Sequence, residues 1–191
     1  MDPLNLRDFL AHCSDEVRSN LAPAMKAINV AQLMFRLLPH ADGFIQPDHL
    51  TADPDGMLHN EVFRAPDQSF KVFVSIWAPG YWSPIFDHGS WGAVGVIYGA
   101  LEQRSYKAPN QALDRHDDLG LNLVGTQILG EGAVATFAPE DGQIVRLGVP
   151  EDREPVACLH FYGGAAGLAH VYNADADNRK TSAGLLHEGL E

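Results

Sequence analysis

Apolar residues in the N-terminal part of the chain recur at the spacing of a helix. One predicted buried stripe, spaced i, i+3, i+4 and i+7, consists of Leu6, Phe9, Leu10 and Cys13. Pro23 interrupts the pattern, and residues 24–38 (AMKAINVAQLMFRLL) predict a second helix that stops at Pro39. The pattern therefore predicts a helical N-terminal segment over residues 1–40.

Beyond residue 40 the pattern changes to short apolar runs separated by Gly, Pro, Asp and Asn. This alternation of runs and turn residues is typical of an all-β sandwich or barrel. The clearest predicted strands span residues 70–78, 92–98, 121–129, 133–137, 144–149, 156–162 and 168–172. We expect a single domain over residues 1–191, mainly β, with a barrel over 50–175 and a polar tail over 176–191.

The run at 156–162 reads VACLHFY, and its side chains should alternate between the two faces of a strand. Cys158, His160 and Tyr162 are expected to share one face. The apolar residues between them are expected on the other face.

Length and charge narrow the classes of function. A chain of 191 residues is the size of one ordinary domain with its own hydrophobic core. The formal net charge of −12 repels phosphate backbones and anionic membrane surfaces, so we expect neither nucleic acid nor a membrane as a partner. No apolar run approaches the ~20 residues that span a bilayer, and the N-terminus does not resemble a signal peptide. Cys13 and Cys158 lie far apart and suggest reduced thiols in a cytoplasmic protein.

Residues 80–99 read GYWSPIFDHGSWGAVGVIYG, and the spacing from the first to the last glycine agrees with the first motif of the cupins. In that motif a His-x-His pair on a strand places two imidazoles on one face, where they can share a metal. Here the same face carries the benzyl group of Phe86 and the imidazole of His88. Gly92 stands where many cupins carry Glu.

A wider set of segments resembles one branch of the cupins. The segments are WAPG at 77–80, SPIFDH at 83–88, WG at 91–92, HFYGGAAG at 160–167 and HVY at 170–172. Over roughly residues 50–180 the chain resembles the thiol dioxygenases of the cysteine dioxygenase type, most closely the bacterial 3-mercaptopropionate dioxygenase branch. The resemblance implies a cupin (double-stranded β-helix, jelly-roll) barrel. Its relatives bind non-haem Fe(II) through three histidines and add O2 to a small thiol, giving a sulfinate.

The resemblance also identifies departures at the iron ligands. Phe86 stands in place of the first histidine, and Val145, in the segment PEDGQIVRL at 139–147, stands in place of the third. Only His88 is retained. One neutral imidazole cannot hold Fe(II) against water and cellular chelators, because a three-ligand site depends on all its ligands. We therefore expect no metal cofactor. Fe(II) or another divalent metal, with His88 as a ligand, is the alternative that the family implies.

Cys158, His160 and Tyr162 are the candidate catalytic residues. They match a Ser-x-His-x-Tyr strand of the family, with Cys158 in place of Ser. His160 and Tyr162 are either an acid/base pair or a hydrogen-bonded pair in the core. Cys158 is either a reactive thiolate or a small apolar side chain. Arg64 or Arg146 is the candidate for binding a substrate carboxylate.

The candidate pocket inside the barrel consists of Phe86, His88, Val145, Trp77 and Trp91. The three tryptophans, Trp77, Trp82 and Trp91, are expected to line or cap the mouth of the barrel. Five further histidines are expected to be solvated in loop-like polar contexts, and they are His40, His49, His59, His116 and His187.

The favoured function is that of a cysteine dioxygenase-like cupin with a degenerate metal site that binds a small molecule in the barrel. An alternative is an oxidoreductase acting on a small thiol or related acid, through a rebuilt metal site or through His/Tyr acid-base chemistry. A third hypothesis is a regulatory subunit that pairs with an intact homologue. Self-association into a homo-oligomer is also left open by the sequence.

Overall fold

Two helices open the chain and lie side by side. The computed structural model of the protein describes residues 4–45, 56–107, 121–164, 170–172 and 180–182. Helix α1 (Leu6–Arg18) begins after Asn5, whose side chain accepts a hydrogen bond from the backbone N–H of Asp8. Helix α2 (Pro23–Leu37) begins at Pro23, whose missing N–H removes no hydrogen bond because the first N–H of a helix has no partner within it. It continues into the 3-10 helix η1 (Leu38–Gly43). The predicted helical segment is confirmed.

The strands of the described residues form two antiparallel sheets. The five-stranded sheet consists, in spatial order, of β1 (Met57–Arg64), β2 (Phe70–Trp77), β9 (Val156–Gly163), β4 (Trp91–Tyr98) and β7 (Val134–Phe137). The six-stranded sheet consists of β11 (Lys180–Ser182), β10 (His170–Tyr172), β3 (Ile85–Asp87), β8 (Ile144–Gly148), β5 (Ala100–Lys107) and β6 (Asn122–Gly130). A short 3-10 helix, η4 (Pro139–Asp141), joins β7 to β8.

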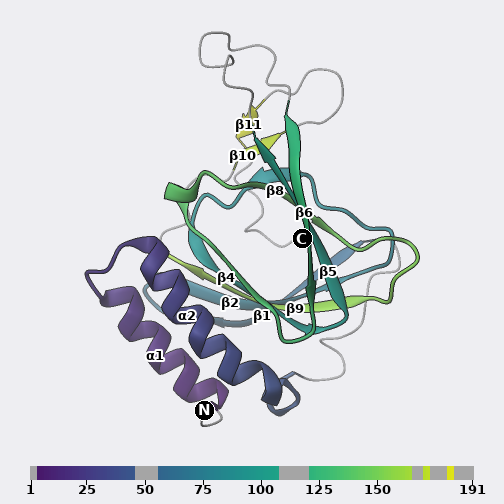
Figure 1. The fold of residues 1–191 in the computed structure, drawn as a ribbon. Coiled ribbons are helices and arrows are strands. Elements are labelled where there is room, and N and C mark those ends of the chain that lie inside the picture. The colour runs from purple at the N-terminus through teal and green to yellow at the C-terminus, as the bar shows by residue number, and fades with distance from the viewer. Residues whose placement is uncertain (1–3, 46–55, 108–120, 165–169, 173–179, 183–191) are drawn as a thin grey trace.

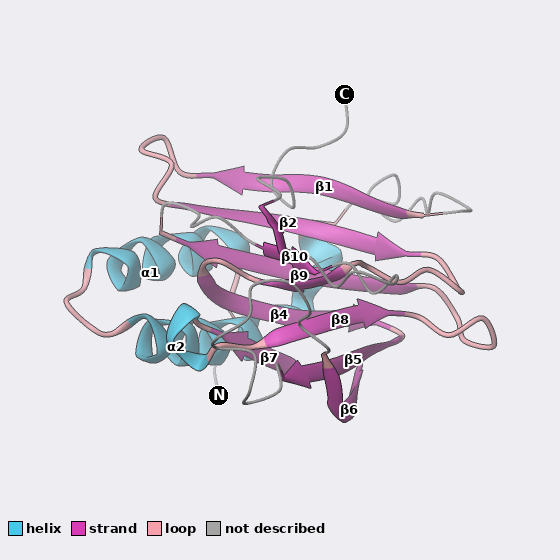
Figure 2. Ribbon diagram, turned by 90° about the horizontal axis from the view of Figure 1, so that it is seen from above, coloured by secondary structure: helices cyan, strands magenta, loops and turns pink. Residues whose placement is uncertain are grey.

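The pairing of the strands is that of a double-stranded β-helix. Strand β2 pairs with β9, β3 with β8, β4 with β7 and β5 with β6, as though one long antiparallel ribbon had been wound into a barrel. The two sheets face each other in Figures 1 and 2, and the helices lie outside the five-stranded sheet. The fold is therefore a mainly β cupin barrel with N-terminal helices, as the sequence predicts.

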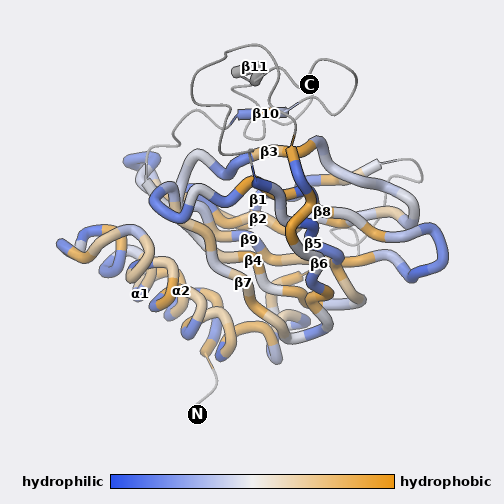
Figure 3. Tube along the Cα trace, turned by 45° about the horizontal axis from the view of Figure 1, so that its top comes forward, coloured by the Kyte–Doolittle hydropathy of each residue, from blue (hydrophilic) through white to orange (hydrophobic). Residues whose placement is uncertain are grey.

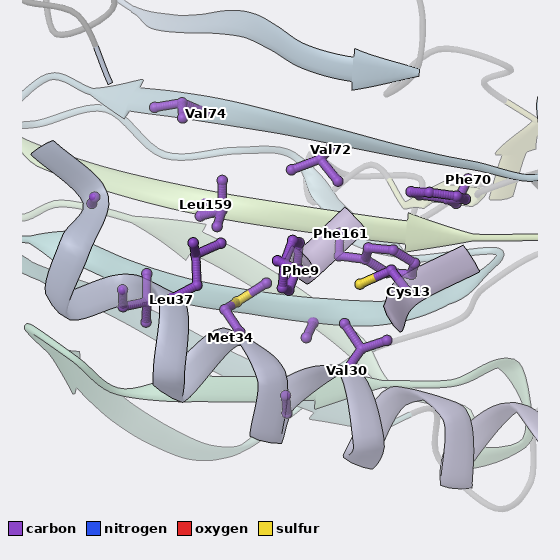
Figure 4. Packing of buried hydrophobic residues seen from close by; sticks show 14 of the residues in the cluster. Phe9, Cys13, Val30, Met34, Leu37, Phe70, Val72, Val74, Leu159 and Phe161 are labelled. Atoms are coloured by element: carbon purple, nitrogen blue, oxygen red, sulfur yellow. The ribbon is translucent and has the colours of Figure 1, made fainter. Parts of the chain in front are cut away.

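One hydrophobic core lies between the helices and the outer face of the five-stranded sheet (Figure 4). The helices contribute Phe9, Cys13, Val30, Met34 and Leu37, and the strands contribute Val72, Val74, Leu159 and Phe161. Leu6 and Leu10 pack against this core, so the predicted helical stripe is confirmed. Burying each large side chain contributes about 1.5–3 kcal/mol, which makes this contact the main attachment of the helices.

A second hydrophobic core fills much of the space between the two sheets. Strand β9 contributes to both cores. Cys158 and Tyr162 lie in the inner core, and Leu159 and Phe161 lie in the helix-facing core. The predicted alternation along 156–162 is thus confirmed. Figure 3 shows orange hydrophobic stretches along the strands, and blue hydrophilic stretches both in connecting loops and on β5 and β8.

The sequence pattern missed some strands. The predicted runs at 70–78, 92–98, 121–129, 133–137, 144–149 and 156–162 match β2, β4, β6, β7, β8 and β9 within two residues. Strand β1 reads MLHNEVFR and β5 reads ALEQRSYK, and neither is an apolar run because both expose polar side chains. Of the predicted polar tail at 176–191, only Lys180–Ser182 lies within the described residues, where it forms β11. No helix of the described residues is long and apolar enough to cross a membrane.

Gly163, at the end of β9, is predicted to accept no side chain. A Cβ atom there would lie 2.2 Å from the indole of Trp91, a rigid ring. We expect Gly163→Ala to lower the free energy of unfolding by about 1–3 kcal/mol, measured by urea denaturation. The matched control is Gly125→Ala on β6, where a Cβ would meet nothing within 4 Å. Equal stability losses in the two variants would contradict this packing argument.

Candidate functional site

Polar side chains gather at one end of the barrel, on the inner face of the five-stranded sheet. The strand register places one row of neighbours at this end, and it consists of Lys71, Tyr162, Gly92 and Phe137. The next rows inward are Phe73–His160–Val94 and Ser75–Cys158–Val96. Trp77 and Val156 occupy the far end. We call the first row the Lys71 end of the barrel.

Phe86 and Val145 form one cross-strand pair within the inner core. They lie directly opposite each other on β3 and β8, and their exposed fractions are 3% and 1%. The ring of Phe86 also meets the imidazole of His88 edge-on, with 5.0 Å between the ring centroids. The three positions that carry iron ligands in the resembled family therefore converge here, but two of them present hydrocarbon.

Gly92 cannot be replaced by a metal-binding side chain without rearrangement. A Cβ atom at this position would lie 2.0 Å from the backbone oxygen of Phe161 and 2.7 Å from the ring of Phe137. Among the residues that the structure describes, no group of three or more His, Cys, Asp or Glu side chains is placed to hold a metal ion. Phe86 and Val145 offer no metal ligand, so these side chains and His88 do not fit a three-histidine Fe(II) centre.

His88, the retained histidine, is held by two contacts at the Lys71 end. Its Nδ1 lies 2.9 Å from the hydroxyl oxygen of Tyr162, and its ring stacks on Phe137 with 3.7 Å between centroids. Burial raises the pKa of Tyr162 above its ordinary value, so the phenol stays protonated near neutral pH. Tyr162 is thus a neutral hydrogen-bond partner of His88.

His160 belongs to a different hydrogen-bonded group. Its Nε2 lies 2.6 Å from Oγ of Ser75, which also accepts a hydrogen bond of 2.7 Å from Nε1 of Trp77. Burial, followed by the positive charges of neighbours such as His59, lowers the pKa of His160 well below 6.5. Nδ1 of His160 is buried and has no hydrogen-bond partner among the described residues.

The three candidate catalytic residues are therefore close together but do not form a hydrogen-bonded triad. The rings of His160 and Tyr162 lie 6.4 Å apart, and no hydrogen bond joins them. Cys158 is fully buried, and burial raises the pKa of its thiol. A buried neutral thiol packs as a small apolar side chain and is a poor nucleophile.

Two of the predicted pocket residues need correction or qualification. Trp91 lies on the outer face of the sheet and packs on Phe161, 5.4 Å away, under the helices. Because Gly92 faces inward, its neighbour Trp91 must face outward, so Trp91 does not line the barrel. Trp77 does lie inside, but it is 2% exposed and belongs to the far end of the inner core.

Trp82 also lies away from the interior. The guanidinium of Arg104 lies 3.9 Å from the centroid of its ring, and that of Arg146 lies 5.5 Å away. Arg146 alternates with the inward-facing Val145 and donates from Nε to the backbone oxygen of Ser83 at 3.0 Å. Trp82 lies beside this outward-facing arginine. The prediction that Trp82 lines or caps the mouth of the barrel is therefore wrong.

Neither candidate arginine is buried in the barrel, although Arg64 lies opposite Lys71 on the same face of the sheet. Arg146 lies on the outer face, and Arg64 is exposed and pairs with Glu61. The positive charge nearest to the inner polar residues belongs to Lys71 instead. Its Nζ lies 5.3 Å from the ring centroid of Phe73 and 5.9 Å from that of Tyr162. Burial, with a smaller effect from Arg64, lowers the pKa of Lys71 to about 8.

His59 lies on β1, opposite Ser75. Its side chain is exposed, as predicted, although its ring lies 4.7 Å from that of Phe73. Desolvation, followed by the charge of Lys71, lowers the pKa of His59 to about 4. The sequence pattern missed the strand itself, because β1 is a polar edge strand that reads like a loop. The available signal was alternation, since His59 and Met57 share the inner face.

A cavity of about 340 Å³ adjoins His88. It is bounded by β3, η4 and β10, and its lining includes Asp87, Phe137, His170 and Tyr172. Asp87 accepts hydrogen bonds from His170 Nδ1 at 2.8 Å and from the Tyr172 hydroxyl at 3.2 Å. Burial and the charge of Asp87 raise the pKa of Tyr172 to about 12. Of the predicted pocket residues, His88 is the one that lines this cavity.

No protein-family model matches the chain. Among solved structures, it is similar to a cupin 2 conserved barrel domain protein from Rhodopseudomonas palustris, with 12% identity and a TM-score of 0.47 over 65% of this chain and 73% of that one. A cupin-like protein from Thermotoga maritima shows 13% identity and a TM-score of 0.46 over 63% of this chain and 78% of that one.

A third similar structure is the cupin domain of an XRE-family transcriptional regulator from Enterobacter cloacae. Its identity is 20% and its TM-score 0.41, over 58% of this chain and 99% of that one. All three proteins are cupins, and none of them is named as a thiol dioxygenase. Similarity at this level carries no argument about what this chain binds or catalyses.

The hydroxyl of Ser75 is predicted to be essential for stability. In Ser75→Ala, both Trp77 Nε1 and His160 Nε2 lose their buried partner. We expect the free energy of unfolding to fall by about 2–4 kcal/mol in a urea titration. Ser105→Ala on β5 is the control, because the Ser105 hydroxyl makes no hydrogen bond to a described residue. A Ser75→Ala variant as stable as the Ser105→Ala control would refute the role of this group.

The stability of the protein is predicted to fall on acidification below pH ~6.5, the pKa of an unfolded histidine. The folded state lowers the pKa of His59 to about 4 and that of His160 well below 6.5. At pH values between the folded and the unfolded pKa of these histidines, the unfolded chain binds more protons than the folded one. The free energy of unfolding therefore rises with pH in this window. The slope contributed by the buried His160 approaches about 1.4 kcal/mol per pH unit, and that of His59 is smaller because solvent screens its exposed ring.

The measurement is the free energy of unfolding at several pH values between 4.5 and 7, roughly the window in which these histidines titrate. His59→Gln should make the slope shallower, whereas His40→Gln, at an exposed position of η1, should not change it. An unchanged slope in His59→Gln would count against the lowered pKa of this ring.

Proposed function

We propose that this protein is a small-molecule-binding cupin in which the iron site of a thiol dioxygenase ancestor has been lost. The observation that carries the proposal is the Phe86–Val145 pair, which is in direct register and almost fully buried. Two apolar side chains at ligand positions add packing energy where imidazoles would need a metal or hydrogen-bond partners. Replacement by Asp, Glu or Cys would instead suggest a change of metal.

The ligand is proposed to bind at the Lys71 end of the barrel, beside His88. This is where the polar side chains of the interior gather, and the adjoining cavity of about 340 Å³ has the size of a small-ligand site. His88 lines that cavity and is oriented by Tyr162 and Phe137. The deeper barrel, with Phe86, Val145 and Trp77, is the packed support of the site rather than its lining.

Ligand binding is favoured over enzymatic thiol oxidation by the state of the candidate catalytic groups. Cys158 is buried as a neutral thiol, and His160 and Tyr162 are engaged in separate hydrogen bonds. Proton transfer between a base and an acid requires the two groups to be within hydrogen-bond reach of each other or of a shared substrate. The alternative, an oxidoreductase acting on a small thiol, is distinguished by the first experiment below.

The purified, untagged protein is expected to hold far less than one equivalent of Fe, Ni, Mn, Zn or Cu, measured by elemental analysis. Oxygen uptake with cysteine or 3-mercaptopropionate should stay near background even when Fe(II) is added. The physical reason is the absence of two of the three imidazole ligands. Rapid, iron-dependent formation of a sulfinate would overturn the proposal and establish the oxidoreductase alternative.

Restoring the two imidazoles should create a metal site. We expect the double variant Phe86→His/Val145→His to bind about one equivalent of Zn²⁺ or Fe(II) per chain, because three imidazoles on one face suffice for a facial site. The control is Phe86→Leu/Val145→Ile, which perturbs the same core without adding ligands. If wild-type protein binds as much metal as the histidine variant, the two apolar residues have not removed the site.

A further inference from the structure

Within the described residues, three of the four edge strands of the two sheets are protected against pairing with another chain. Strand β1 carries the exposed Glu61–Arg64 ion pair and a register shift, β7 lies against α2, and β11 is three residues long. Charge, irregularity, coverage and shortness are the devices by which native proteins prevent one sheet edge from pairing with another. A long edge that lacks them is a candidate interaction surface.

Strand β6 is such an edge. It is nine residues long, reads NLVGTQILG, and contains no charged residue and no proline. It lies at the end of the six-stranded sheet beside β5 (Figure 2), and residues 122–128 are all exposed. Its register shift against β5 falls at Val124, so the strand is regular from Gly125 to Gly130. The backbone N–H and C=O groups on its free side have no partner strand among the described residues.

The edge strand also exposes large apolar side chains. Their exposed fractions are 54%, 53% and 55% for Leu123, Val124 and Ile128. Thr126 lies opposite Arg104, which in turn lies opposite the outward-facing Arg146. By alternation, Val124 and Ile128 share this outer face with Thr126. The outer face of the sheet therefore ends in an uncharged apolar strip.

The order of side chains along β6 is symmetric about Thr126. Val124 and Ile128, both β-branched, lie two residues to either side of it. In an antiparallel pair of two copies centred on Thr126, Val124 of each copy lies opposite Ile128 of the other, and the two threonines lie opposite each other. Apolar β-branched side chains and threonine hydroxyls matched in this way are favourable cross-strand neighbours. The strand is thus complementary to its own copy.

Charge favours the same partner. Each chain carries a formal net charge of −12, so two copies repel each other over most approaches. Strand β6 adds no charge, and its charged neighbours on β5, Glu102 and Arg104, form an ion pair with each other at 2.8 Å. Contact at β6 brings together two uncharged strips, which is where the repulsion between two copies is weakest. A charged partner strand would find no counterion here.

We propose that two copies of this chain associate through antiparallel pairing of their β6 strands around Thr126, so that the six-stranded sheet continues across a two-fold axis. Each copy then pairs the free backbone groups of the other and covers its apolar strip. The proposal is independent of the ligand-binding function, because no residue of β6 lines the cavity beside His88.

The first measurement is the mass of the full chain in solution, by sedimentation equilibrium over a range of protein concentrations. We expect a reversible equilibrium between monomer and dimer. A monomer at every concentration would overturn the proposal, and so would a larger assembly with no dimer, since pairing of two β6 edges closes after two copies.

Two double variants with the same number of substitutions test the register. Val124→Glu/Ile128→Glu places like charges opposite each other, and Val124→Lys/Ile128→Glu places opposite charges there. We expect the second variant to dimerise at least about tenfold more tightly than the first, because like charges on paired strands are destabilising. Phe35→Glu, at an exposed position of α2, is the control and should dimerise like wild type. Circular dichroism spectra establish that each variant is folded. Equal dimer affinities in the two folded double variants would contradict the pairing.

Cysteine cross-linking locates the two-fold axis independently. Thr126→Cys should form a disulfide between two copies on mild oxidation, because the axis passes between the two copies of residue 126. In Asn122→Cys, the control, the two new thiols are about 26 Å apart at ~3.3 Å per residue and should not be linked. The native Cys13 and Cys158 are buried and do not compete. Absence of a cross-link in Thr126→Cys, or equal cross-linking in both variants, would show that the copies do not pair in this way.

Discussion

The alternation of side chains along β9 is the constraint on which the rest of the structure depends. Every residue from Val156 to Gly163 is buried, and the strand lies between β2 and β4 in the five-stranded sheet. One face of β9 anchors the helices through Leu159 and Phe161, and the other presents His160 and Tyr162 to the barrel. A slip of one residue would exchange these two sets, placing polar rings under the helices.

The buried polar side chains of the interior are bonded to one another at two depths. The Ser75 hydroxyl bonds to both Trp77 and His160 at the centre, and Tyr162 bonds to His88 nearer the Lys71 end. Phe86 and Val145 pack in the same inner core, where the exclusion of water strengthens hydrogen bonds. Among the described residues, Nδ1 of His160 is the buried side-chain atom that lacks a partner.

The sequence predicted the elements whose pattern is set by burial alone. The helical stripe and the apolar strands follow from periodicity, and the two faces of β9 follow from alternation. The placement of Trp91 failed because a resemblance in sequence says which residues are near a motif, not which side of the strand they occupy. Applying the same alternation to Gly92 would have corrected it.

Local sequence does not place His59 and Lys71 near His160. The position of His59 depends on how β1 and β2 pair, where His59 lies opposite Ser75 and Lys71 opposite Arg64, with a register shift between Glu61 and Phe63. No local feature of a polar edge strand specifies such a shift. Beyond the shift, Arg64 lies opposite Lys71 and pairs with Glu61. The charges that surround Lys71 therefore depend on one irregular pairing at the edge of the sheet.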